Sequence, residues 1–295
     1  MKIIFIGCVE SSLKFLEATY HNTNAEIIGI VTKTQSTFNS DHISLADFAK
    51  ENNIDWIDYK TNDEMEGWIS QKEPDLIYCF GWSHILPISI LGIPKYGAIG
   101  YHPALLPANR GRHPIIWALV LGLETTGSTF FCLTEEADAG DILNQQIVTI
   151  KKNDDARTLY NRLLTVGENQ VVELTNAYLG NTIQSINQDD KTANTWRKRT
   201  KKDGLIDWRM TTDSILRLVR ALTKPYVGAH AVYQENDYII WKAETVNSDL
   251  TKIKNIEPGK VIETSGQTFT VKTGDTLIKI TEHEWSTIPQ VGEYL

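Results

Sequence analysis

The sequence predicts a two-domain protein, with an N-terminal α/β domain built on a parallel sheet and a smaller, mainly antiparallel β domain after it. Short apolar runs alternate with helix-like segments over the first third of the chain, which is typical of βαβ units. A polar, charged stretch then separates this part from a C-terminal part of short alternating runs. The 295 residues suit one large domain or two modest ones, and they are enough to bury a core.

In the N-terminal part, uninterrupted apolar runs predict buried strands, and apolar residues at helical spacing predict helices. The strands are expected at residues 2–7, 26–32 and 74–81, and the helices at residues 11–21, 44–53 and 63–72. Ser11 or Ser12 is expected to cap the first helix. Helices on both faces of the sheet make the domain Rossmann-like, and such sheets bind ligands beyond the carboxyl ends of their strands.

The turn after the first strand, GCVESS, contains a single glycine. A dinucleotide fingerprint needs two more, to turn tightly and to admit a pyrophosphate, so this turn argues against NAD binding. Two interpretations stay open: a plain tight turn, or an anion held by backbone N–H groups at the start of the helix.

Residues 154–179 repeat apolar side chains at helical spacing, and the composition changes after them. We expect a Rossmann-like domain over residues 1–182, a linker over 183–204 and a C-terminal domain over 205–295. One helix, near 211–223, and short alternating runs suit a small OB-like β-barrel or a curved sheet. The RKRTKK run at 197–202 is either a solvated face or a contact for phosphate.

The bulk composition excludes several classes of protein. A formal net charge of -8 and a pI near 5.4 disfavour general nucleic-acid binding, which normally needs a basic face. No apolar run is as long as a membrane span, and MKIIFIG is too short for a signal peptide, so we expect a cytoplasmic protein. Cys8, Cys79 and Cys132 stand singly among apolar residues, which indicates reduced, buried thiols and no metal site.

The loop AIGYHPALLPANRGRHP, residues 98–114, is unusually stiff and polar for a segment that follows an apolar run. Asp138 lies thirty-six residues after His102, beyond the apolar stretch STFFCL, which reads as a strand able to bring the two side chains together. A carboxylate beside an imidazole stabilises the protonated ring and makes it a better base for an amine proton. Spacing alone leaves the ordinary alternative open, in which both residues are structural or solvated.

Four segments together resemble the formyltransferases that use 10-formyltetrahydrofolate, a family that includes methionyl-tRNA formyltransferase and the sugar N-formyltransferases. They are YCFGWSHILP, GAIGYHPALLPANRGRHPIIWALVLG, EEADAGDIL and DGLIDW…ILRLVRALTKPYVGAHA, in the family's order and spacing. The resemblance covers almost the whole chain. The form NRGRHPIIWAL looks more like the sugar enzymes, which formylate the amine of a nucleotide-linked amino sugar.

The resemblance implies roles for individual residues. His102 matches the catalytic histidine that takes the amine proton, and Asp138 matches the aspartate that positions and charges it. It implies no metal. The folate is expected to lie against Phe80, Gly81, Trp82, Ile85, Leu86, Pro87, Leu133 and Asp138.

One position departs from the family pattern. The family usually carries asparagine two residues before the histidine, where its amide stabilises an oxyanion, and this chain has Gly100. Loss of such a donor typically costs about 10²–10³-fold in rate. Protonated His102, a backbone N–H, Asn109 or an ordered water are the candidate substitutes, and a slow or inactive enzyme is the other outcome.

The rest of the loop suggests substrate contacts. Pro103 and Pro107 fix the backbone φ after His102. Arg110 and Arg112 either bind a diphosphate with forked hydrogen bonds or form surface ion pairs. Pro103 and the segment around Asn39 and Asp41 are further candidates for binding the sugar nucleotide, although a plain capped turn explains residues 38–41 equally well.

The resulting hypothesis is an N-formyltransferase that acts on a UDP- or TDP-linked amino sugar, such as a 4-amino-deoxyhexose, in the synthesis of lipopolysaccharide or another surface glycan. Methionyl-tRNA formyltransferase is the first alternative, although the segment after the second strand has few basic residues for a tRNA backbone. A non-catalytic folate or sugar-nucleotide binding protein, disabled by Gly100, is the second. Related sugar enzymes suggest a homodimer.

Overall fold

The computed structural model describes residues 1–36, 40–247 and 249–295, which form two compact units. The first unit comprises Met1–Pro114, Thr125–Thr149 and Asn161–Arg197, and the second comprises Ile115–Glu124, Ile150–Tyr160 and Lys198–Leu295. The two units alternate along the chain, and the boundaries expected at residues 182 and 204 stay a prediction. None of the helices in these ranges combines the length and apolar character needed to span a membrane.

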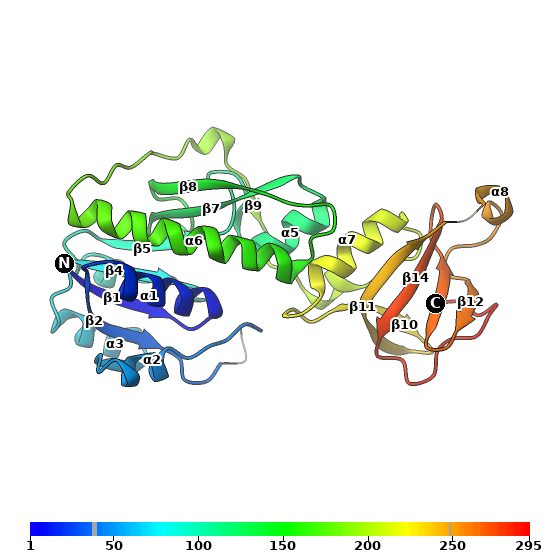
Figure 1. The fold of residues 1–295 in the computed structure, drawn as a ribbon, viewed down its shortest axis with the longest axis horizontal. Helices are drawn as coiled ribbons and strands as arrows, with labels where there is room; N and C mark the ends of the chain where they lie inside the picture. Colours follow the sequence, from blue (N-terminus) through cyan, green and yellow to red (C-terminus); the bar gives the residue numbers. More distant parts are fainter. Residues whose placement is uncertain (37–39, 248) are drawn as a thin grey trace. The chain divides into compact units, whose positions relative to one another are not determined.

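A sheet of seven strands forms the centre of the first unit, in the order β3-β2-β1-β4-β5-β7-β8 (Figure 1). The strands are β1 (Lys2–Gly7), β2 (Glu26–Thr32), β3 (Trp56–Asp58), β4 (Leu76–Phe80), β5 (Ala98–His102), β7 (Thr125–Cys132) and β8 (Ile142–Thr149). The strands from β3 to β5 pair in parallel, which confirms the expected Rossmann-like core. The sheet is nevertheless mixed, because β7 and β8 continue it in antiparallel pairs. The sequence did not predict β3.

Helices cover this sheet on both faces. They are α1 (Glu10–Asn22), α2 (Ala46–Glu51), α3 (Asn62–Ser70), α4 (Ile88–Leu91) and α6 (Ala156–Leu179), whose residues from 161 onward belong to this unit. The expected cap of α1 is wrong, since Val9 occupies the cap position and Ser12 lies inside the helix. The Ser12 hydroxyl instead donates to the backbone oxygen of Phe80 at 2.6 Å, which ties α1 to β4.

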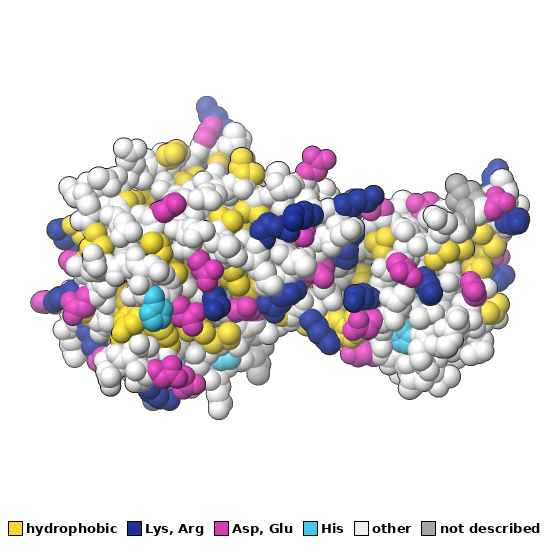
Figure 2. All heavy atoms as spheres, in the orientation of Figure 1, with side chains coloured by type: hydrophobic (Ala, Val, Ile, Leu, Met, Phe, Trp, Pro, Cys, Tyr) yellow, Lys and Arg dark blue, Asp and Glu magenta, His cyan; other side chains and the backbone are white. Residues whose placement is uncertain are grey.

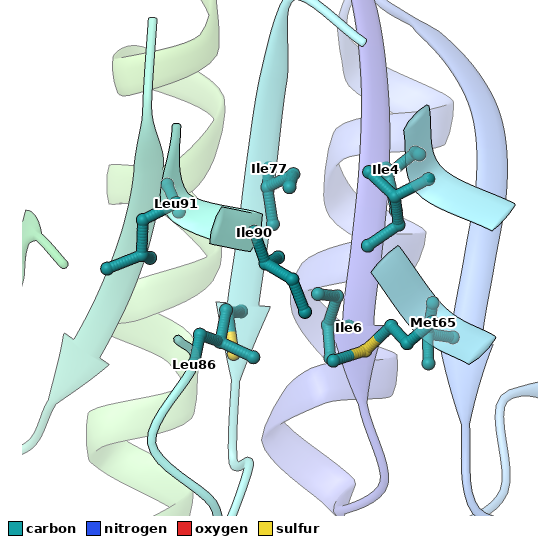
Figure 3. Close-up of a cluster of buried hydrophobic side chains, with 11 residues drawn as sticks. Ile4, Ile6, Met65, Ile77, Leu86, Ile90 and Leu91 are labelled. Carbon is teal, nitrogen blue, oxygen red and sulfur yellow. The ribbon is translucent and has the colours of Figure 1, made fainter. Parts of the chain in front are cut away.

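Alternate residues of β1 and β4 point to opposite faces and form two apolar layers. Ile4 and Ile77 pack with Met65 of α3 and Ile90 of α4 in one cluster (Figure 3). On the other face, Phe80 packs edge-on against Phe15 of α1. Burial on both faces is typical of parallel strands, and it leaves the strand ends as the place for polar chemistry.

The second unit contains a five-stranded antiparallel sheet in the order β10-β11-β14-β13-β12, as expected for the C-terminal domain. Its elements are α5 (Pro114–Leu121, with Pro114 in the first unit), α7 (Thr212–Leu222), β10 (Ala229–Tyr233), β11 (Asn236–Val246), α8 (Leu250–Ile253), β12 (Val261–Ser265), β13 (Thr268–Lys272) and β14 (Leu277–His283). Within the RKRTKK run, Arg199 is buried and lies over the Trp117 ring at 4.7 Å. This arginine is therefore a packing residue of the unit.

Short elements complete the chain. They are β6 (Arg110–Gly111), β9 (Thr195–Trp196) and two 3-10 turns at Asp190–Thr192 and Lys201–Gly204. β6 and β9 pair in parallel, so the stretch expected to be a linker contributes a strand beside the loop that follows β5. Figure 2 shows acidic and basic side chains intermixed on the displayed face.

Candidate active site

His102 is the last residue of β5, and its ring is held in one orientation. The imidazole is 5% exposed, and Nε2 lies 2.8 Å from the backbone oxygen of Asn109. A carbonyl oxygen only accepts hydrogen bonds, so Nε2 carries the hydrogen and Nδ1 of the neutral ring has the free lone pair. Nδ1 is therefore the atom that can receive a proton.

Asp138 faces that atom. Its Oδ2 lies 3.8 Å from His102 Nδ1 and accepts a hydrogen bond from Gly111 N at 2.8 Å. β7 runs antiparallel to β5 and ends beside its start, where Leu133 N donates to Ala98 O. The loop after Leu133 then returns along the sheet, so this loop delivers Asp138 to the histidine.

Gly111 has no room for a side chain. Its φ is +99°, and a Cβ there would lie 2.3 Å from the backbone oxygen of Trp196. The glycine lets β6 approach β9 closely enough to pair, and this pairing directs the Gly111 N–H at Asp138.

Gly100 lies in β5 between Cys79 of β4 and Phe131 of β7. A Cβ at this position would lie 2.6 Å from Leu133 Cδ2 and 3.0 Å from Phe131 Cζ. These two apolar side chains therefore fill the space where the resemblance predicts an asparagine amide. A larger residue at position 100 would therefore require the side chains of Leu133 and Phe131 to shift.

A cavity of about 480 Å³ opens beside this pair. Most of the residues expected at the site line it: Gly81, Trp82, Ile85, Leu86, Gly100, His102, Arg112, Leu133 and Asp138. The cavity lining also includes three apolar residues that were not predicted, namely Cys79, Leu91 and Phe131. Burial raises the pKa of the Cys79 thiol, so this sulfur stays protonated and is an apolar wall atom at neutral pH.

Several expected residues lie elsewhere. Phe80 is fully buried in the aromatic core, and Pro87 precedes α4. The guanidinium of Arg110, 6% exposed, donates to Gln188 and to Asp190, so contact with a diphosphate would require these bonds to break.

The remaining expected residues make backbone contacts. Pro103 accepts from Thr126 through its backbone oxygen, Asn109 N donates to Asn194, and the backbone oxygen of Asp41 accepts from Glu10. Asn39 lies outside the described residues.

The expected residue Trp82 belongs to a group of aromatic and basic residues whose other members, Lys33, Tyr59 and His84, were not predicted. Lys33 Nζ lies 5.0 Å from the centre of the Trp82 ring and 3.3 Å from His84 Nδ1, and Tyr59 packs edge-on against Trp82. The indole Nε1 of Trp82 is buried without a partner among the described residues. Burial, together with the charges of Lys33 and Arg112, lowers the pKa of His84 below its ordinary value.

The cavity lining combines polar and apolar groups. A general base with a fixed tautomer and a carboxylate partner lines it, together with an indole N–H from which no described residue accepts. Among the described residues, no three acidic, histidine or cysteine side chains are grouped as a metal site would require. The chemistry of these residues suits proton removal from a nucleophile.

Sequence models of known families match both parts of the chain. The model described as formyl transferase matches residues 1–175, and the model of the formyl transferase C-terminal domain matches residues 198–289. The chain is 31% identical over 289 residues to a methionyl-tRNA formyltransferase of Staphylococcus epidermidis, covering 95% of this chain and 90% of that protein. It is 37% identical over 193 residues to the bifunctional polymyxin resistance protein ArnA of Wigglesworthia glossinidia brevipalpis, covering 65% of this chain and 28% of ArnA.

Solved structures share the fold. An N-formyltransferase from Helicobacter canadensis, in complex with folinic acid and dTDP-3-aminofucose, has a TM-score of 0.72 at 18% identity, covering 96% of this chain and 99% of that one. HypX from Aquifex aeolicus in complex with tetrahydrofolic acid has a TM-score of 0.67 at 18% identity, covering 96% of this chain and 44% of HypX. At such identities the likeness concerns the fold.

Proposed function

The chain belongs to the formyl transferase family, and from this premise we propose that it transfers a formyl group from 10-formyltetrahydrofolate to the amine of a nucleotide-linked amino sugar. The observation that carries the proposal is the pair His102 and Asp138, 3.8 Å apart in the lining of a cavity with apolar walls. We place the reaction in the cytoplasm, in the synthesis of lipopolysaccharide or another surface glycan.

His102 is the general base of this reaction. The backbone oxygen of Asn109 holds the Nε2 hydrogen, so the proton of the attacking amine moves to Nδ1. The ring becomes positively charged, and the Asp138 carboxylate beside Nδ1 stabilises that charge. Asp138 is itself oriented by the N–H of Gly111.

The cavity walls fit the reduced folate. Leu86, Leu91 and Leu133 offer an apolar surface to a flat ring system, and no described residue accepts from the N–H of Trp82, so this group is available to a ligand acceptor. When bound, 10-formyltetrahydrofolate supplies the electrophilic formyl carbon. The residues around Trp82 and Leu86 hold it and exclude water from the cavity.

The nucleotide part of the substrate suits the basic residues of the cavity lining. Arg112 and His84 line the cavity, and Lys33 contacts His84. A diphosphate placed there would meet three cationic or protonatable side chains, which favours a nucleotide-linked sugar over a free amino sugar. We further propose that the nucleotide is UDP or TDP, that the sugar is a 4-amino-deoxyhexose and that the protein forms a homodimer.

Methionyl-tRNA is the second candidate substrate, because methionyl-tRNA formyltransferases match this chain over nearly its whole length at 29–31% identity. Affinity for tRNA depends largely on Lys and Arg contacts with phosphates, and the formal net charge of this chain is -8. The charge therefore favours the small substrate.

Turnover assays with 10-formyltetrahydrofolate test the proposal. The acceptors are UDP- and TDP-linked 3-amino and 4-amino sugars on one side and methionyl-tRNA on the other. We expect formylation of at least one sugar nucleotide. Transfer to methionyl-tRNA alone would establish the tRNA enzyme, and binding of folate and sugar nucleotide without turnover would establish a non-catalytic protein that lacks the asparagine replaced by Gly100.

A further inference from the structure

Gln188 is a buried amide in the stretch that the sequence predicted to be a linker. Its side chain is 5% exposed, and both ends of the amide are fully bonded. Oε1 accepts from Arg110 Nε at 3.1 Å and from Arg110 Nη2 at 2.9 Å. Nε2 donates to the backbone oxygen of Asp138 at 2.9 Å and to that of Gly140 at 2.7 Å. Four bonds of matching polarity fix which end of the amide is oxygen.

These bonds join two loops that are far apart in the sequence. Arg110 belongs to the loop after His102, and Asp138 belongs to the loop between β7 and β8. Gln188 does not line the cavity, and its hydrogen-bond partners among the described residues are Arg110, Asp138 and Gly140. Its effect on the cavity is therefore transmitted through the backbone that it holds.

The backbone of Asp138 needs such support. Its φ is +58°, a left-handed conformation that is uncommon for a residue with a side chain. The loop 133–140 turns back along the sheet, and the carboxylate must stop beside His102 Nδ1. Donation by Gln188 to the backbone oxygens of Asp138 and Gly140 holds the loop on both sides of its turn.

We propose that Gln188 is a positioning residue for the catalytic pair: it holds Asp138 against His102 by linking the backbone of the 138–140 turn to Arg110. The proposal deepens the proposed function and rests on it for its kinetic test. It assigns a role to residues 185–197, because Asn194 of the same stretch accepts from Asn109 N, next to the carbonyl that orients His102.

Two substitutions separate the ends of the amide. Gln188→Glu keeps an acceptor for Arg110 but removes both donors and places a carboxylate oxygen against two carbonyl oxygens. Gln188→Leu removes all four bonds. Asn187→Leu is the matched control, because Asn187 is an amide of the same stretch whose Nδ2 donates to Asp141 at 3.0 Å.

We expect kcat to fall about 10–10²-fold in both Gln188 variants, since a displacement near 1 Å at a catalytic group has effects of this size. KM for both substrates should stay within about twofold, because the apolar walls of the cavity are untouched. Near-normal kcat in Gln188→Glu would overturn the proposal, because it would mean that only the bond to Arg110 matters. Equal losses in Asn187→Leu would also overturn it.

A second measurement does not depend on turnover. The Gly111 amide donates to the Asp138 carboxylate, so its hydrogen-exchange rate reports on the position of Asp138. We expect faster exchange at Gly111 in Gln188→Leu and an unchanged rate in Asn187→Leu. Unchanged exchange in both variants would overturn the positioning role. If the wild-type chain formylates no substrate, the proposed function fails, and the exchange experiment still tests Gln188.

Discussion

Two loops follow neighbouring strands of the same sheet, and they are built in opposite ways. After β5, the ring nitrogen of His102, the backbone N–H of Asn109 and the guanidinium of Arg110 all have partners within the chain. After β4, the indole N–H of Trp82 is buried without a partner among the described residues, and Ile85 is 65% exposed.

The difference separates catalysis from binding. A general base must be held in one orientation before the substrate arrives, and the loop after β5 does this with internal hydrogen bonds. A binding wall needs surfaces and polar groups that only a ligand satisfies, and the loop after β4 has both. Substitutions in the first loop should therefore lower kcat, and substitutions in the second should raise KM.

The largest effect is expected for the catalytic pair. His102→Asn removes the base and should lower kcat by about 10²–10⁴-fold, the usual contribution of such a group. Asp138→Asn removes the charge that stabilises the protonated ring and should cost a similar factor. The double variant should be little worse than the more damaging single one, because the two residues act as a unit.

His113→Asn is the matched control, since it makes the same substitution in the same loop at a residue with no catalytic assignment. Steady-state kinetics with the accepted sugar nucleotide measures all four variants. Near-wild-type turnover in His102→Asn, or multiplied losses in the double variant, would contradict the assignment of the pair.

The next largest effect is expected at Gly100, which lines the cavity two residues before His102. Gly100→Asn should destabilise the protein by about 1–3 kcal/mol through overpacking against Leu133 and Phe131. It should also lower turnover, by up to about 10²-fold if the β5 backbone moves. Thermal unfolding and kcat are the measurements, and a raised kcat would show that the absent amide limits the native enzyme.

Two further variants interpret that result. Gly67→Asn is the control, since Gly67 is exposed in α3 and a Cβ there meets nothing within 4 Å. Gly100→Asn with Leu133→Ala gives the amide room and should recover part of the lost stability. If the double variant recovers stability but not kcat, the loss of kcat arises from the reaction itself and not from the loss of stability.

The sequence predicted most of the fold because its periodicity reports burial directly. Residues 3–6 are apolar on both faces of β1, and such a run is typical of a parallel strand that is covered on both faces. The antiparallel direction of β7 was not predicted, because direction depends on pairing partners rather than on the strand's own residues. β3 is three residues long and gives almost no pattern.

The sequence predicted some residues of the site and missed others, because some roles follow from a local segment and others depend on contacts with distant residues. His102 and Asp138 stand in recognisable segments, so the family resemblance pointed to both. Gln188 lies in a polar stretch whose composition is that of a linker, and its role depends on contacts with residues 78 and 50 positions away. Lys33 and Tyr59 reach Trp82 only through the strand order, which single residues do not encode.

A moderate effect is expected at the binding loop. Trp82→Phe keeps an aromatic ring but removes the N–H for which the described part of the chain offers no acceptor, so KM for 10-formyltetrahydrofolate should rise about fivefold, the value of one hydrogen bond. kcat should stay within about twofold. Trp68→Phe, at a ring that packs in the core away from the cavity lining, is the control. A fall in kcat with unchanged KM would remove the distinction between the two loops.

The smallest effect is a shift in the titration of His84. Burial comes first among the causes that lower its pKa, followed by the charges of Lys33 and Arg112, so the ring is neutral at neutral pH. Lys33→Met removes one of those charges, and the pKa of His84 should rise toward 6.5, as measured by NMR titration of the ring protons. Lys50→Met is the control, because Lys50 also lies over a tryptophan ring, Trp56, at 5.5 Å.

Binding of a sugar nucleotide should also raise the pKa of His84, since a diphosphate beside the ring favours its protonated form. An unchanged pKa in Lys33→Met would mean that burial and Arg112 set the pKa of His84 without Lys33. An unchanged pKa on addition of the sugar nucleotide would mean that the diphosphate binds away from His84.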